Sequence, residues 1–184
     1  MQTARVLLIL GALAEPVAAQ QPTVPPPAPS PTADSSDVRS LDAILATLYG
    51  VISGPAGERD WNRFRSLFAP GARLIPTRHP RDSAAVASVL DVEGYVGRAG
   101  SYFKQNPFYE TEAARRVERF GSIAHVFSTY ESRHAPTDTE PFSRGINSIQ
   151  LLFDGIRWWV VTVYWDAERP GLTIPREYLP PSGP

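Results

Sequence analysis

The sequence predicts one α+β domain in which three amphipathic helices precede a meander of four antiparallel strands. Up to about residue 103, apolar residues recur at intervals of three and four, the period of a helix with one buried face. Beyond residue 108, apolar runs flank Gly121-Ser122 and Asp154-Gly155. An Asp-Gly dipeptide between two apolar runs is a strong signal of a β-hairpin. Helices followed by strands indicate the α+β class.

The helices are bounded by capping residues and by glycine or proline. A side-chain oxygen at the first position satisfies free backbone N–H groups, so aspartate favours a helix start. We expect helices over residues 38–52, 60–68 and 91–103, capped by Asp37, Asp60 and Asp91. Between the second and third helices, residues 72–76 form a short strand candidate and residues 77–83 a polar loop.

The expected strands cover residues 108–120, 123–134, 143–153 and 156–166. If Phe120 pairs with Ile123, one face of the first hairpin is apolar and the other is charged. If Phe153 pairs with Ile156, both faces of the second hairpin are apolar, and Gln150 shares a face with Trp165. Helices can cover only one face of a sheet. The other face is therefore a candidate for a homodimer interface.

Composition excludes several classes of partner and site. Apolar residues make up 42% of the chain, enough for a packed core, and the net charge of −1 argues against a nucleic-acid partner. The absence of cysteine excludes disulfides and thiolate chemistry. The histidines are scattered without a metal-binding spacing, so neither a metal nor another cofactor is expected.

The N-terminal region has the pattern of an exported protein. Arg5 precedes the short apolar run of residues 6–14, and Val17-Ala18-Ala19 supplies small residues before a cleavage point. The run is shorter than the ~20 residues that span a bilayer, so no stable membrane span is expected. We expect a signal peptide over residues 1–19 and a periplasmic or secreted protein. The alternatives are an uncleaved anchor and a buried core helix.

The rest of the chain divides by composition. A Pro-rich, disordered tether is expected over residues 20–37, because such a tract favours extended conformers and buries little. The globular domain is expected over residues 38–179, followed by a short tail over residues 180–184.

The predicted element order resembles the nuclear transport factor 2-like superfamily, which includes SnoaL-like proteins. The stretches DWNRFRSLFAPGARLIP, GSIAHVFSTYESR and GINSIQLLFDGIRWWVVTVYWD carry the resemblance. It implies a cone-shaped fold, with three N-terminal helices packed on a curved antiparallel sheet. It also implies a deep pocket between helices and sheet, and frequent dimers through the sheet. Fold alone does not specify function, because superfolds host unrelated activities.

The resemblance also suggests site positions. By element order, Tyr49 lies where the ketosteroid isomerases of this superfamily have an oxyanion-hole tyrosine, and Trp165 where they have a pocket aromatic. The position of their catalytic base falls near Pro76, which carries no carboxylate. The position of their second oxyanion acid falls near Ile149 or Gln150. Isomerase chemistry of that kind is therefore not supported.

Three functions follow from the sequence. The leading hypothesis is a non-catalytic domain that binds a small, apolar or partly polar molecule. Its expected ligand-binding residues are Tyr49, Gln150, Trp165, Arg115, Ser128 and Tyr130. The alternative is a SnoaL-like acid–base isomerase, dehydratase or cyclase that uses His79 and Tyr49. The third is a structural dimerisation module. A titratable group inside the cavity would favour catalysis, and a filled core would favour the structural module.

Overall fold

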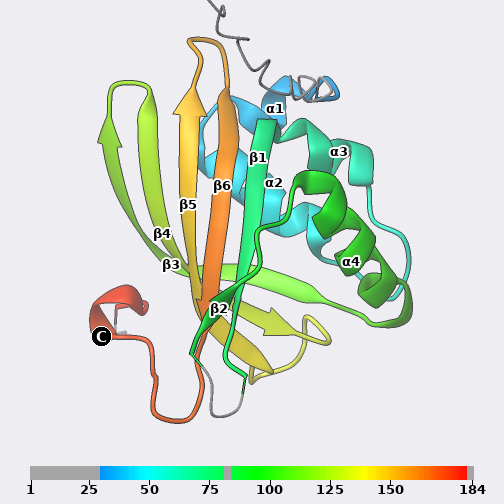
Figure 1. The fold of residues 1–184 in the computed structure, drawn as a ribbon, viewed down its shortest axis with the longest axis vertical. Coiled ribbons are helices and arrows are strands. Elements are labelled where there is room, and N and C mark those ends of the chain that lie inside the picture. The colour runs from blue at the N-terminus through cyan, green and yellow to red at the C-terminus, as the bar shows by residue number, and fades with distance from the viewer. Residues whose placement is uncertain (1–29, 81–83, 182–184) are drawn as a thin grey trace, which may run out of the picture.

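The computed structural model describes residues 30–80 and 84–181 and contains one six-stranded sheet (Figure 1). Helices α1 to α4 lie on one side of the sheet. In chain order the elements are α1 (Ser35–Val38), α2 (Leu41–Ile52), α3 (Trp61–Ser66), β1 (Phe68–Arg78), β2 (Val86–Ala87), α4 (Val92–Gln105), β3 (Tyr109–Phe120), β4 (Ile123–Arg133), β5 (Ser143–Phe153), β6 (Trp158–Ala167) and the short 3₁₀ helix η1 (Arg176–Tyr178). The expected signal segment, residues 1–19, lies outside the described residues.

The sheet has the order β2-β1-β6-β5-β4-β3. Strands β3 to β6 form the expected antiparallel meander. Strand β1, longer than the expected strand at residues 72–76, runs parallel to β6. The sheet is therefore mixed rather than purely antiparallel. The α+β class is confirmed. The expectation of an antiparallel sheet is wrong for one pair of strands, β1 and β6, which run parallel.

The first expected helix is two helices, because Ser40 has an extended backbone and its hydroxyl caps α2 at the Ala43 N–H. Asp34, not Asp37, caps α1. Asp60 and Asp91 cap α3 and α4 as expected, each accepting from a backbone N–H three residues on. Three expected helices thus become four elements, and α4 follows β1 and β2 in the chain.

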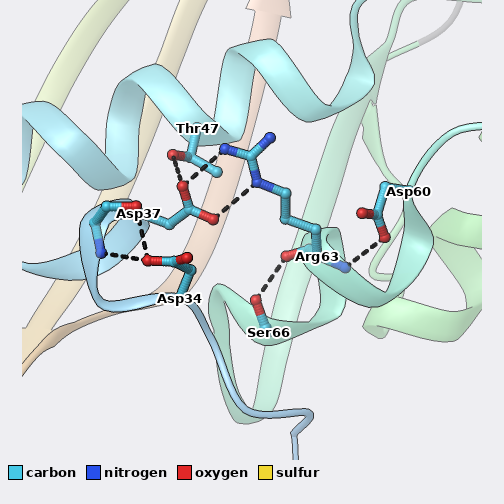
Figure 2. Close-up of polar contacts among 7 residues, drawn as sticks. Asp34, Asp37, Thr47, Asp60, Arg63 and Ser66 are labelled. Carbon is cyan, nitrogen blue, oxygen red and sulfur yellow. Dashed lines mark hydrogen bonds and ion pairs between the residues drawn. The ribbon is translucent and has the colours of Figure 1, made fainter.

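Asp37 of α1 is buried and forms hydrogen bonds with residues of α2 and α3 (Figure 2). Its carboxylate accepts two hydrogen bonds from the Arg63 guanidinium, at 2.7 and 2.8 Å, and one from the Thr47 hydroxyl at 3.2 Å. The hydrogen bonds from Arg63 hold the pKa of Asp37 below its usual value. Residues preceding Val38 therefore pack on the folded unit, earlier than the domain boundary expected from composition.

The core lies between the helices and the concave face of the sheet. Side chains from α2, α3, β4, β5 and β6 are almost wholly removed from solvent there, among them Ile44, Leu45, Phe64, Val126, Ile149 and Val160. Burying each such side chain stabilises the fold by roughly 1.5–3 kcal/mol. The same face of the sheet continues past this core to line a cavity.

Two β-bulges decide which side chains reach that cavity. In the first hairpin Phe120 pairs with Ile123 as expected, but an extra residue at Ala113 shifts the register. In the second hairpin Phe153 pairs with Trp158 rather than Ile156, and this shift of two residues leaves the side chains as far as Val160 on their expected faces. A bulge at Val161 then reverses the faces along the rest of β6.

The convex face of the sheet is partly covered by the chain's own C-terminal segment. The Tyr178 ring packs on Phe127 with ring centroids 5.0 Å apart, and the Tyr178 carbonyl accepts from Thr129. Leu152 and Tyr164 on the same face stay 37% and 44% exposed. Within residues 30–80 and 84–181, no helix is long and apolar enough to cross a bilayer.

Candidate functional site

A cavity of about 460 Å³ lies between α2, α4 and the concave face of the sheet. Its walls are mainly aromatic and aliphatic and include Phe64, Tyr95, Tyr102, Phe103, Phe108, Phe142 and Trp165. The volume falls in the range of small-molecule sites, and such sites combine apolar walls with a few placed polar groups.

The charged group of interest in this cavity is Glu110 of β3. The Ser132 hydroxyl donates to its Oε2 at 2.9 Å. Its backbone is held by Ser53, whose Oγ accepts from the Glu110 N–H at 2.9 Å. Among the described residues, no lysine or arginine pairs with this carboxyl. Burial therefore dominates and raises the pKa of Glu110 to about 7.

Glu110 reaches the cavity because of the bulge at Ala113. Without the bulge, Glu112 would oppose Glu131 and point to the convex face. With it, Glu112 opposes Tyr130, and Glu110 opposes Ser132. A one-residue slip moves every side chain beyond it to the other face. The bulge thus places two carboxylates on the concave side, where sequence periodicity predicted none.

Tyr49 of α2 lines the cavity but is engaged in a buried hydrogen-bond chain. Its hydroxyl lies 2.7 Å from the Ser128 hydroxyl and accepts from Asn147 Nδ2 at 3.1 Å. Ser128 in turn donates to Glu112 at 2.6 Å. Burial raises the pKa of Tyr49 above its usual value, so the phenol stays protonated.

Two other tyrosines offer hydroxyls to the cavity. The Tyr95 hydroxyl makes no hydrogen bond to any described residue, and burial raises its pKa. Burial also raises the pKa of Tyr130 to about 12. The Tyr130 ring packs against Gly145, where a Cβ would lie 2.6 Å from the Tyr130 oxygen and 2.2 Å from the Asp166 carbonyl oxygen. Gly145 is therefore required for this tyrosine to take its place.

Of the residues expected from the sequence, Tyr49, Trp165 and Tyr130 line this one cavity. Gln150 does not: its side chain is exposed on the convex face. The expectation that Gln150 shares a face with Trp165 is wrong, because the bulge at Val161 pairs Gln150 with Thr162 and turns Trp165 to the concave side. Asn147 supplies an amide in the cavity instead.

Ser128 and Arg115 lie near the cavity without lining it. Ser128 is wholly buried and acts through its hydrogen bonds to Tyr49 and Glu112. Arg115 lines a second, more open groove between α2 and β3, where it pairs with Asp42 and, at 3.5 Å, with Glu112. That groove also reaches Tyr49 and Glu110, so Glu110 lies between an apolar cavity and a polar groove.

His79 and Tyr49 are not brought together. The His79 Nε2 lies 3.0 and 3.1 Å from the Asp166 carboxylate oxygens, and His79 lines a groove with Phe127, Ser148 and Tyr164 of the convex face. A joint role for His79 and Tyr49 has no geometric support. In the part of the chain that the structure describes, no group of three histidine or acidic side chains could hold a metal ion.

Sequence reasoning missed Glu110, Glu112 and Tyr95. The consecutive residues Ala113-Ala114 and Arg115-Arg116 interrupt the alternation along β3, and this interruption is the signal that could have located the bulge. Glu110 is half-buried because it packs against α2, β4 and β5, and periodicity within one strand does not report such packing.

Comparison with known proteins supports the fold. A scan of protein families finds no match, and a search of curated proteins also finds none. Among solved structures, a Xanthomonas campestris protein provisionally assigned as a calcium/calmodulin-dependent protein kinase II association domain matches with a TM-score of 0.50. The two chains are 14% identical, and the match covers 71% of this chain and 86% of that one. At this identity the match shows a shared fold.

Two further matches are weaker in TM-score. An NTF-2-like protein of unknown function from Silicibacter pomeroyi has a TM-score of 0.49 and 13% identity, over 71% of this chain and 94% of that one. A Kribbella flavida protein provisionally assigned as a ketosteroid isomerase has a TM-score of 0.39 and 20% identity, over 82% and 95%. Both proteins are similar to this chain at low identity, and the shared fold rests on the match to the Xanthomonas campestris protein.

Proposed function

We propose that this domain binds a small, largely apolar molecule in the cavity, with Glu110 meeting the molecule's polar group. The observation that carries the proposal is a carboxyl without a cationic partner among the described residues, set in a 460 Å³ cavity with aromatic walls. A buried charge is costly unless it is paired. A carboxyl kept in such a place is typical of a functional site rather than of a structural one.

The chemistry of the walls describes the ligand. Its body is apolar and flat enough to pack between aromatic rings such as Phe103 and Trp165. Its polar end carries an N–H or O–H group, or an amine, that can donate to the ionised Glu110 carboxylate; the protonated form of Glu110, also present near neutral pH, can donate to an oxygen instead. The hydroxyls of Tyr95 and Tyr130 can donate to an oxygen on the same ligand.

Filling the cavity tests the binding proposal. Ala99 of α4 lines the cavity, whereas Ser101 of the same helix is exposed. Titration with the apolar dye N-phenyl-1-naphthylamine should raise its fluorescence with the wild-type protein and with Ser101→Trp. Ala99→Trp should lose at least tenfold in affinity. Equal binding by all three proteins would place the dye elsewhere and argue against this cavity as the site.

A second candidate function is acid–base catalysis by Glu110, favoured by its pKa of about 7. A group that titrates near neutral pH can both accept and donate a proton during turnover. Ligand recovered from protein purified from its own host would be incubated with enzyme in D₂O and analysed by mass spectrometry. Catalysis predicts deuterium incorporation that Glu110→Gln abolishes and Glu118→Gln retains. Binding without exchange would leave the non-catalytic function.

Export and assembly complete the proposal. The signal pattern of residues 1–19 supports cleavage after Ala19. N-terminal sequencing of the exported protein tests this, and a mature chain that begins at Met1 would contradict it.

The exposed Leu152 and Tyr164 of the convex face support a homodimer through the sheet. Sedimentation at micromolar concentration should give twice the chain mass. A strict monomer would mean that the segment ending in η1 covers enough of this face by itself.

A further inference from the structure

We infer that the molecule bound in the cavity is an anion, whose acidic group pairs with Arg98 of α4 at the cavity mouth. The inference rests on the proposed function, since it names the chemical class of molecule that the same cavity binds. Glu110 meets the hydrogen-bond donor of that molecule, and Arg98 meets its acidic group. The ligand is then an amphipathic acid, such as a carboxylic acid with an apolar body and one N–H or O–H group.

The exposure of the lining side chains locates the mouth of the cavity. Phe64, in the interior wall, is 1% exposed. Tyr102 and Phe142 line the same cavity but are 42% and 46% exposed. Their rings lie on either side of Phe108, at centroid distances of 6.4 and 6.1 Å, so they belong to one rim. Arg98 also lines the cavity and is exposed, so a molecule entering from solvent passes its side chain.

Helix geometry places Arg98 beside that rim. Arg98 follows Tyr95 by three residues and precedes Tyr102 by four, and all three line the cavity from one side of α4. Arg98 and Tyr102 are therefore neighbours on the helix surface. The apolar stem of an arginine can cover an aromatic rim while its guanidinium stays in water. The guanidinium of Arg98 is thus available to a group that a bound molecule presents at the mouth.

The charge of Arg98 is left unpaired, unlike the other charges of α4. Glu93 pairs with Arg65 at 2.6 Å. Lys104 pairs with Glu58 at 2.7 Å. Within residues 30–80 and 84–181, no carboxylate or carbonyl accepts a hydrogen bond from Arg98, and no aromatic ring lies under its guanidinium. The cavity mouth therefore carries a cation with all its donors free for a ligand.

The chemistry of the two charged groups describes the ligand. Glu110 and Arg98 line one cavity and form no ion pair with each other, so a ligand can meet both with different parts of its structure. A guanidinium presents paired N–H donors that match the oxygens of a carboxylate, sulfonate or phosphate. The net charge of −1 gives the chain no general attraction for anions, so a preference for an acid would be local to Arg98.

Two dyes that differ by one sulfonate test the inference on the whole protein. The anionic dye 1-anilinonaphthalene-8-sulfonate is N-phenyl-1-naphthylamine with a sulfonate added. In fluorescence titrations, Arg98→Gln should weaken binding of the anionic dye about fivefold, as expected for one partly exposed ion pair, and should leave the neutral dye within about twofold of wild type. Arg98→Lys keeps the charge and should restore most of the loss. Arg73→Gln removes an equal charge from an exposed residue of β1 that does not line the cavity, and should leave both dyes unchanged.

The comparison of the two dyes separates this inference from the binding proposal. Equal weakening of both dyes in Arg98→Gln would overturn the inference, because Arg98 would then be only part of the apolar wall. An unchanged affinity for the anionic dye in Arg98→Gln, or the same loss in Arg73→Gln, would also overturn it. Neutral dye that fails to bind wild type, or that binds Ala99→Trp equally well, would count against the cavity as a binding site. Neutral dye bound in the cavity, with no effect of Arg98 on the anionic dye, would count against this inference alone.

Discussion

Replacing Glu110 by glutamine should make the protein more stable at alkaline pH and remove part of its pH dependence. Burial raises the pKa of Glu110 from 4.5 to about 7, so the folded state binds this proton more tightly than the unfolded chain. The stabilising contribution of the protonated group is complete below the unfolded value of 4.5. It is lost as the pH rises through 7.

The magnitude follows from linkage. Each pKa unit corresponds to about 1.4 kcal/mol, so the pKa difference corresponds to about 3 kcal/mol at high pH and to roughly 2.5 kcal/mol between pH 5 and pH 8. Glutamine has nearly the same shape and no charge, so its variant lacks this loss. A bound apolar ligand that displaces water from the cavity would increase the loss in the wild-type protein.

Urea unfolding of wild type, Glu110→Gln and Glu118→Gln at pH 5 and pH 8 would measure the effect. Glu118 is exposed, so its variant should follow the wild-type protein. The expected result is a gain of Glu110→Gln over wild type that is larger at pH 8 by roughly 2.5 kcal/mol. A gain that is the same at both pH values would refute the reasoning, because it would mean that the folded protein does not perturb this carboxyl.

Three further variants test the fold around the site. Asp37→Ala should destabilise the protein at pH 7 by about 1–3 kcal/mol, because it removes the buried acceptor of Arg63 and Thr47. Because the folded protein lowers the pKa of Asp37, the difference in unfolding free energy between wild type and variant should shrink as the pH falls through the acid range, and urea unfolding would measure it. Gly50→Ala should raise stability by about 0.5–1 kcal/mol in thermal unfolding, since its Cβ would meet no atom within 4 Å and alanine favours the helix; a loss of stability would contradict the open environment of this position. Gly145→Ala should both destabilise the protein and weaken dye binding, because its Cβ would force Tyr130 or β6 to move; unchanged binding would show that the cavity tolerates that shift.

Sequence periodicity located the helices and strands because each buries one apolar face. The positions of Asp60 and Asp91 as caps followed from local chemistry alone. Asp37 shows the limit of that reasoning: the same residue type can cap a helix or pair with a distant arginine. Only the packing of α3 against α1 and α2 brings Arg63 close enough to decide.

The site was harder to predict because it depends on two single-residue bulges. The bulge at Ala113 brings Glu110 and Glu112 to the concave face, and the bulge at Val161 separates Trp165 from Gln150. Neither bulge changes the apolar content of its strand, and the trace that the first leaves in the sequence is the doubled residues Ala113-Ala114 and Arg115-Arg116. The parallel pairing of β1 with β6 is likewise a long-range contact that local pattern does not encode.

The most direct test of the proposed function is native mass spectrometry of the protein purified from its own host. We predict a species heavier than the mature chain, or than its dimer, by one small molecule per chain. That species should be retained in Ser101→Trp and absent in Ala99→Trp, where the cavity is filled. Wild-type protein that carries no added mass, together with equal dye binding by the two tryptophan variants, would contradict the claim that this cavity is a binding site.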